Sequence, residues 1–168
     1  PVFVLSLVFF VLRPLTTQLS IYWNEKKDRL FFKQVRLLFL VMLALGVIIV
    51  GLGYFIGTEI LGAIYGVALQ KYKIPFTILL IGGILNVLAL VIDIIMTIFR
   101  KQNYLMLAYL LTFILSKLIT HSFIQNQQLI GAAISFLIVM TIFFSLSMVI
   151  YLFVRRWSIK ASKETTDG

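Results

Sequence analysis

Five long apolar runs, separated by short charged or polar stretches, constrain this sequence more than any other feature. A helix that crosses the hydrocarbon core of a bilayer needs about 20 consecutive apolar residues. Stretches such as Val41–Val50 lack the alternation of apolar and polar residues that a membrane β-barrel requires. The sequence therefore predicts an all-α, polytopic membrane protein whose helix bundle spans residues 1–157. The predicted transmembrane helices cover residues 2–23, 37–57, 75–99, 104–122 and 129–154.

The composition excludes a water-soluble globule. Of 168 residues, 61% are hydrophobic and 12% are charged, whereas soluble domains average roughly 45–50% and about 25%. The net charge of +9 would suggest nucleic acid as a partner, but the basic residues form short clusters between apolar runs. Because the apolar sequence starts directly after Pro1, without the cationic segment of a signal peptide, we expect a piece of a longer protein.

Basic residues gather in alternate loops, which predicts an orientation. One set of loops and the C-terminal tail carry eleven basic residues, whereas the opposite loops carry only Lys71 and Lys73. Loops rich in Lys and Arg stay on the cytoplasmic side of a membrane, so we expect a cytoplasmic C-terminus. The eleven are Lys26, Lys27, Arg29, Lys33, Arg36, Arg100, Lys101, Arg155, Arg156, Lys160 and Lys163.

Two connecting segments are too apolar for free loops. Residues 24–36 mix charges with Leu30, Phe31 and Phe32, which is typical of a short helix lying in the membrane interface. Residues 58–74 are too short to span the membrane, and we expect a second interfacial segment there. The tail, residues 158–168, is expected to be mobile and cytoplasmic.

Polar residues within the first run form one candidate site. Arg13 lies midway along it, and Pro14 removes a backbone hydrogen bond and favours a kink. Helical steps of three or four residues place Thr17 on the same face as Arg13. Ionisable groups inside a membrane are costly and are functional candidates by default, so we interpret this face as lining a water-filled cavity. The alternatives are a buried ion pair that only joins helices and a position nearer the outer surface.

The third run carries a stripe of small and polar residues that permits close helix contact. Asn86 is assigned to the cavity and Asp93 to ion coupling, with proton or sodium as the coupling ion. The alternatives for Asp93 are an ion pair with Arg13 or Lys117 and a carboxylate near the cytoplasmic surface. The stripe consists of Gly82, Asn86, Ala89, Asp93 and Thr97.

The fourth run aligns hydroxyl groups beside a lysine. Ser116 and Lys117 are assigned to the same cavity, with Tyr109, Thr112 and Thr120 on the neighbouring face. The alternative is that Lys117 extends its ammonium group to the outer interface. The sequence contains no Ser–His–Asp set, Gly-rich phosphate loop or His cluster. We therefore expect no catalysis, no metal site and no organic cofactor.

Four short segments in fixed order carry a family resemblance: Arg13–Leu19, Gly57–Gly66, Leu79–Asn86 and Leu129–Ala133. Over residues 10–154 the chain resembles the C-terminal part of bacterial polysaccharide flippases, within the multidrug/oligosaccharidyl-lipid/polysaccharide exporter superfamily. The resemblance implies a two-lobe transporter of 12 or 14 helices, of which these five would form most of the C-terminal lobe. The missing N-terminal lobe would complete the cavity.

The resemblance also implies a substrate, a location and a mechanism. Such proteins move undecaprenyl-diphosphate-linked oligosaccharides across the bacterial cytoplasmic membrane for capsule, exopolysaccharide or other envelope polymers. Alternating access would expose the cavity to each side in turn. A multidrug or cation exporter of the same superfamily and a non-transporting scaffold subunit are the alternatives.

Overall fold

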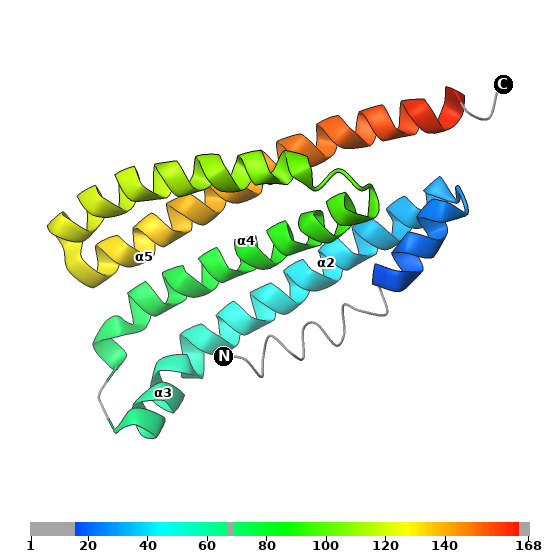
Figure 1. Cartoon of the computed structure of the whole chain (residues 1–168). Helices are drawn as coiled ribbons and strands as arrows, with labels where there is room; N and C mark the ends of the chain where they lie inside the picture. The colour runs from blue at the N-terminus through cyan, green and yellow to red at the C-terminus, as the bar shows by residue number, and fades with distance from the viewer. Residues whose placement is uncertain (1–15, 67–68, 165–168) are drawn as a thin grey trace.

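A computed structural model describes residues 16–66 and 69–164, without the side chains of 121, 122, 124–128 and 157–164. Every regular element in these ranges is helical, which confirms the all-α fold (Figure 1). After a helix over residues 16–24, the elements are α2 (Asp28–Leu52), the π-helix η1 (Gly53–Gly57) and α3 (Thr58–Tyr65). They are followed by the 3₁₀-helix η2 (Gln70–Tyr72), α4 (Lys73–Ile98) and α5 (Asn103–Glu164). Arg13 lies outside the described residues.

Four described helical stretches are long and apolar enough to cross a membrane, as expected of a multi-pass membrane protein. They are Asp28–Tyr65, Gln70–Ile98, Asn103–Thr120 and Leu129–Arg156. Of the run predicted at 2–23, only residues 16–23 are described, and these are helical. α4 begins two residues before the predicted run 75–99 and ends one residue before its end.

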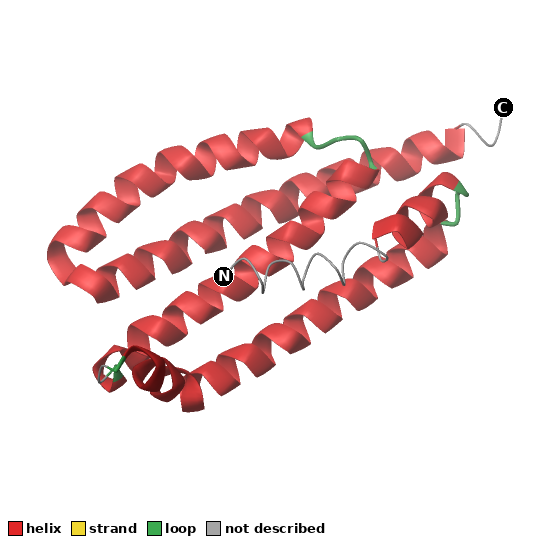
Figure 2. Ribbon diagram, turned by 60° about the horizontal axis from the view of Figure 1, so that its bottom comes forward, coloured by secondary structure: helices red, strands yellow, loops and turns green. Residues whose placement is uncertain are grey.

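The long helices form an antiparallel bundle with α4 in the middle. α4 packs against α2 on one side and against α5 on the other (Figures 1 and 2). α5 doubles back on itself, and we call residues 103–120 its first arm and residues 129–156 its second arm. The second arm runs parallel to α4 and the first arm runs antiparallel to it.

Helix continues through several segments in which we expected breaks. Residues 28–36 are the first turns of α2 rather than a separate interfacial helix, because Asp28 stabilises the helix N-terminus and no Gly or Pro follows before Gly46. Residues 58–65 continue from α2 through η1, although α3 turns away from the axis of α2 (Figure 1). The expected free tail from residue 158 is helical as far as Glu164. α5 contains no Pro and a single Gly, and its backbone stays helical through the reversal between its two arms.

Glycines let α2 and η1 approach α4 closely. A β-carbon on Gly46 would lie 2.8 Å from Ile84, one on Gly53 2.2 Å from Leu80, and one on Gly57 2.5 Å from Phe76. These separations are too short for two carbon atoms, so a larger residue at any of these positions would displace the facing side chain of α4. Small residues at helix contacts are the usual device for close packing in membranes.

Lysine and arginine end two of the helices in a conformation usually reserved for glycine. Lys26 and Arg100 have φ angles of 54° and 56°. The amides of Lys27 and Lys101, one residue later, donate to carbonyls five residues back, at 3.0 Å in each case. This is the Schellman pattern, in which the left-handed residue closes the helix.

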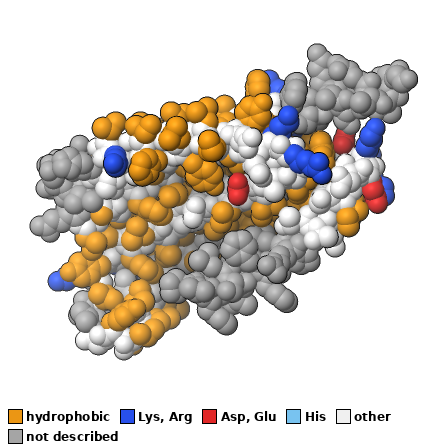
Figure 3. Space-filling model, viewed as in Figure 1, with side chains coloured by type: hydrophobic (Ala, Val, Ile, Leu, Met, Phe, Trp, Pro, Cys, Tyr) orange, Lys and Arg blue, Asp and Glu red, His pale blue; other side chains and the backbone are white. Residues whose placement is uncertain are grey.

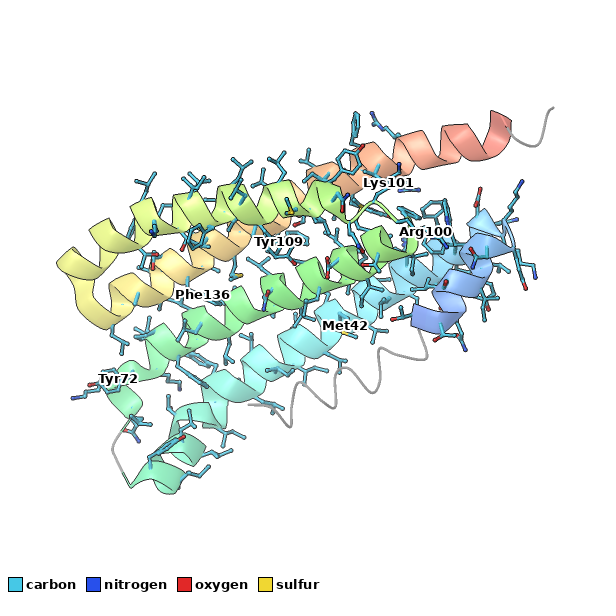
Figure 4. All side chains as sticks on the ribbon, viewed as in Figure 1. Met42, Tyr72, Arg100, Lys101, Tyr109 and Phe136 are labelled. Atoms are coloured by element: carbon cyan, nitrogen blue, oxygen red, sulfur yellow. The ribbon has the colours of Figure 1, made fainter. Side chains whose placement is uncertain are left out.

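The charged groups gather at the two ends of the bundle. Figure 3 shows apolar side chains covering the middle of one face and basic groups concentrated toward one end. Arg100 and Lys101 lie at that end, opposite Tyr72 (Figure 4). At the same end an aromatic cluster packs between the helices. The centroid of the Trp23 ring lies 4.5 Å from that of Phe99 and 5.3 Å from that of Phe31. The end near Arg100 and Lys101 therefore carries more basic groups than the end near Tyr72, where the sequence places Lys71 and Lys73.

Candidate functional site

The polar stripe of α4 lies at the edge of its contact with α5. Gly82 and Ala89 are buried, Asp93 is partly buried, and Asn86 and Thr97 are exposed. A β-carbon on Gly82 would lie 2.7 Å from the Phe136 ring. The stripe therefore has one edge packed against α5 and one edge open, rather than facing a cavity along its whole width.

Three helical segments meet beside this stripe. Ala89 of α4, Ala108 of the first arm and Phe143 of the second arm form one buried cluster. Tyr109 packs its ring against Phe143, with centroids 4.8 Å apart, and is 48% exposed. Tyr109 thus packs the first arm against the second arm (Figure 4). We call this junction the α4–α5 seam.

Asp93 is one helical turn beyond Ala89 and therefore flanks the seam. Its carboxylate is near enough to the Tyr109 hydroxyl to interact with it electrostatically. Within the described ranges, no side chain forms an ion pair or hydrogen bond with this carboxylate; the Thr97 hydroxyl donates to the Asp93 backbone carbonyl at 2.9 Å. A carboxylate without such a partner in an apolar bundle is costly, which makes Asp93 a candidate functional residue.

Two buried hydroxyl groups also flank the seam. Ser147 follows Phe143 by one turn, and Thr112 follows Ala108 by one turn. Neither hydroxyl has a hydrogen-bond partner in the part of the chain that is described, whereas Thr77, Ser135 and Thr141 each bond to a carbonyl on their own helix. An unsatisfied buried hydroxyl costs about 1–3 kcal/mol. The seam therefore concentrates unsatisfied polar groups.

Asp93 and Ser147 lie at the same level of the bundle. Phe136 of the second arm faces Gly82 of α4, and Phe143 faces Ala89. The two pairs have the same offset in sequence, because α4 and the second arm run in parallel. That offset also pairs Asp93 with Ser147. A carboxylate with hydroxyl groups nearby supplies the oxygen donors that a proton or a sodium ion requires.

The other predicted site residues lie further apart. Ser116 is partly exposed on the first arm, two turns from Tyr109. Lys117 is exposed, and its Nζ lies 5.6 Å from the centre of the Phe113 ring, so it does not pair with Asp93. Thr17 lies on the helix over residues 16–24, whose neighbouring residues Gln18 and Leu19 face α2. Of the predicted site residues, the structure therefore places Asp93 and Asn86 on the same face of α4, and it places Thr17 and Lys117 elsewhere.

Ser147 is the site residue that sequence reasoning missed. Its run is apolar, and its neighbours Phe143, Phe144 and Met148 suggested only packing. The sequence contains no separate signal for it, because Ser147 stands out only once its burial and its place beside α4 are known. Among the described residues, no group of three His, Asp or Glu side chains is placed to hold a metal ion.

The chain lacks cysteine, so single cysteines can report on water access to the seam. We expect Asn86→Cys and Ser116→Cys to react with a membrane-impermeant thiol reagent in the full-length protein, because Asn86 lies at the open edge of the stripe and Ser116 is assigned to the same cavity and is partly exposed. Ala89→Cys, at a 3% exposed position on the same stripe, is the matched control and should stay unlabelled. Equal labelling at all three positions, or none at Asn86 and Ser116, would contradict an aqueous edge.

Comparison with known proteins gives no significant match, whether to a family model, to a curated protein or to a solved structure. The class is defined by the chain itself: an all-α, multi-pass membrane protein with an acidic residue beside a three-segment helix junction.

Proposed function

We propose that the chain is part of an ion-coupled membrane transporter. The observation that carries this proposal is the Asp93 carboxylate, which lies within a membrane-spanning helix and has no ion-pair partner among the described side chains. Intramembrane carboxylates with this character mark ion pathways and proton relays. Asp93 would bind and release the coupling ion, with the hydroxyl groups of the seam as further oxygen donors.

The resemblance to polysaccharide flippases supports a substrate class. We infer that the full-length protein moves undecaprenyl-diphosphate-linked oligosaccharides across the bacterial cytoplasmic membrane by alternating access. Arg13 would hold the diphosphate with two parallel hydrogen bonds, and Lys117 would add a second positive charge. The concentration of basic residues at one end of the bundle supports a cytoplasmic C-terminus.

The test uses the full-length protein in liposomes that contain a labelled undecaprenyl-diphosphate oligosaccharide. Movement between leaflets is measured as the fraction of sugar that an external lectin can reach after an ion gradient is applied. We expect Lys117→Gln to slow this movement about tenfold, the effect of one lost charge-assisted contact. Lys71→Gln, which removes an exposed charge beside Tyr72, is the matched control and should leave the rate unchanged.

The possible outcomes distinguish the alternatives. Gradient-driven export of a cationic dye, without movement of the lipid-linked sugar, would favour a drug or cation exporter and overturn the substrate class. Absence of both activities in correctly folded protein would favour a scaffold subunit and overturn the transporter proposal.

A further inference from the structure

A groove lies at the basic end of the bundle, away from the α4–α5 seam. It has a volume of about 430 Å³ and lies between the helix over residues 16–24 and the first turns of α2. Its lining combines Lys33 and Arg36 with Tyr22 and with three leucines of α2: Leu30, Leu37 and Leu40. The groove is thus cationic and apolar at once.

The cationic and apolar parts of the groove follow one another along α2. Leu37 and Leu40 are each 54% exposed and lie one turn beyond the two cations, toward the middle of the helix. From Gln34 and Leu37 the lining continues into an almost wholly apolar pocket of about 120 Å³, formed by Leu38, Val41 and other residues of the next turns. A ligand that fits both parts has a negative head and a hydrocarbon chain.

The cations of the groove are not neutralised by the nearby acid Glu25. The Glu25 carboxylate lies 2.7 Å from the Lys27 ammonium group, and their hydrogen bond raises the pKa of Lys27. Within the described ranges, Lys33 and Arg36 have no ion-pair partner. Both belong to the end of the bundle that also presents Arg100, Lys101 and Arg155, and so attracts anions.

We propose that this groove is a binding site for an anionic phospholipid of the surrounding bilayer. The phosphate group contacts Lys33 and Arg36, the Tyr22 hydroxyl donates to the headgroup, and an acyl chain lies along Leu37 and Leu40 into the apolar pocket. Basic pockets between helices at a membrane surface bind acidic headgroups in this way. The site does not depend on the proposed transport function.

The experiment measures lipid retention by the purified chain. Native mass spectrometry in detergent compares phosphatidylglycerol with phosphatidylcholine of the same acyl chains, and we expect preferential retention of phosphatidylglycerol. The double variant Lys33→Gln/Arg36→Gln should weaken this retention about thirtyfold, the factor that two lost attractions between cations and phosphate imply. Lys71→Gln/Lys73→Gln removes the same charge at the opposite end and should retain the lipid.

A second measurement follows thermal unfolding of the unmodified chain, so that the proposal does not depend on how the variants fold. Phosphatidylglycerol should raise the unfolding temperature, whereas phosphatidylcholine and inorganic phosphate should not. Equal effects of both phospholipids would overturn an anionic site. An equal effect of inorganic phosphate would show that the acyl chain contributes nothing and would overturn a lipid site. Full retention by the Lys33→Gln/Arg36→Gln variant would overturn the assignment of these two residues.

Discussion

Asp93→Asn in the full-length protein is expected to lower ion-driven transport between about 10-fold and 100-fold, the range of one lost charged contact. Asparagine has nearly the shape of aspartate but neither binds a proton nor carries a charge at neutral pH. If Asp93 holds the coupling ion, the variant still binds substrate but no longer responds to the ion gradient. Transport measured with and without the gradient in liposomes checks this expectation.

The same variant is expected to unfold at a higher temperature than the unmodified protein. A charge within a membrane-spanning helix costs about 2.5–3.5 kcal/mol on insertion scales, and no described side chain offsets this cost by pairing with Asp93. Reduced transport together with increased stability identifies a residue kept for function. Reduced stability would instead show that Asp93 pairs with another part of the protein. Glu59→Gln, which changes an exposed acid in α3, is the control and should alter neither property.

Gly82→Leu is expected to destabilise the bundle by about 1–3 kcal/mol, the usual cost of overpacking. The β-carbon of the new leucine alone would lie 2.7 Å from Phe136 and 3.7 Å from the Cα atom of Leu137. Both a ring and the backbone of the second arm therefore obstruct a larger side chain at position 82. Thermal unfolding in detergent, followed by circular dichroism, measures the loss.

The adjacent glycine offers the matched control for this prediction. A β-carbon on Gly83 has no atom within 4 Å, so Gly83→Leu should leave the unfolding temperature nearly unchanged. If the two variants are equally destabilised, the cost comes from replacing glycine as such, and the close approach of α4 to the second arm is not its cause.

The apolar runs predicted the fold class because hydrocarbon length and backbone hydrogen bonding leave a long apolar segment few alternatives to a helix. The breaks between helices were predicted less well. Charged residues at 28–36 suggested a separate interfacial helix, but charged side chains do not by themselves stop a helix, and these residues belong to α2. The polar residues at 125–128 do mark the place where α5 reverses direction, between the spans Asn103–Thr120 and Leu129–Arg156. Composition therefore showed where membrane-spanning helices occur, and it showed less well where the helical backbone begins and ends.

The candidate site was only partly predictable for a different reason. Periodicity placed Asn86, Ala89 and Asp93 on one face of α4, but it could not show that a neighbouring helix covers half of that face. Ser147 became a candidate only because α4 and the second arm run in parallel at a fixed offset. Such relations between helices depend on which faces pack together, and the sequence of one helix does not contain this information.

The left-handed residues Lys26 and Arg100 combine a fixed backbone conformation with a positive charge. Glycine at either position would relieve a backbone strain of roughly 1–2 kcal/mol, but it would remove a charge from a connection that is only a few residues long. The connection between α4 and α5 therefore combines a rigid corner with two cations, Arg100 and Lys101. A corner of this kind fixes α4 and the first arm as an antiparallel pair, with both cations held at the same end of the bundle.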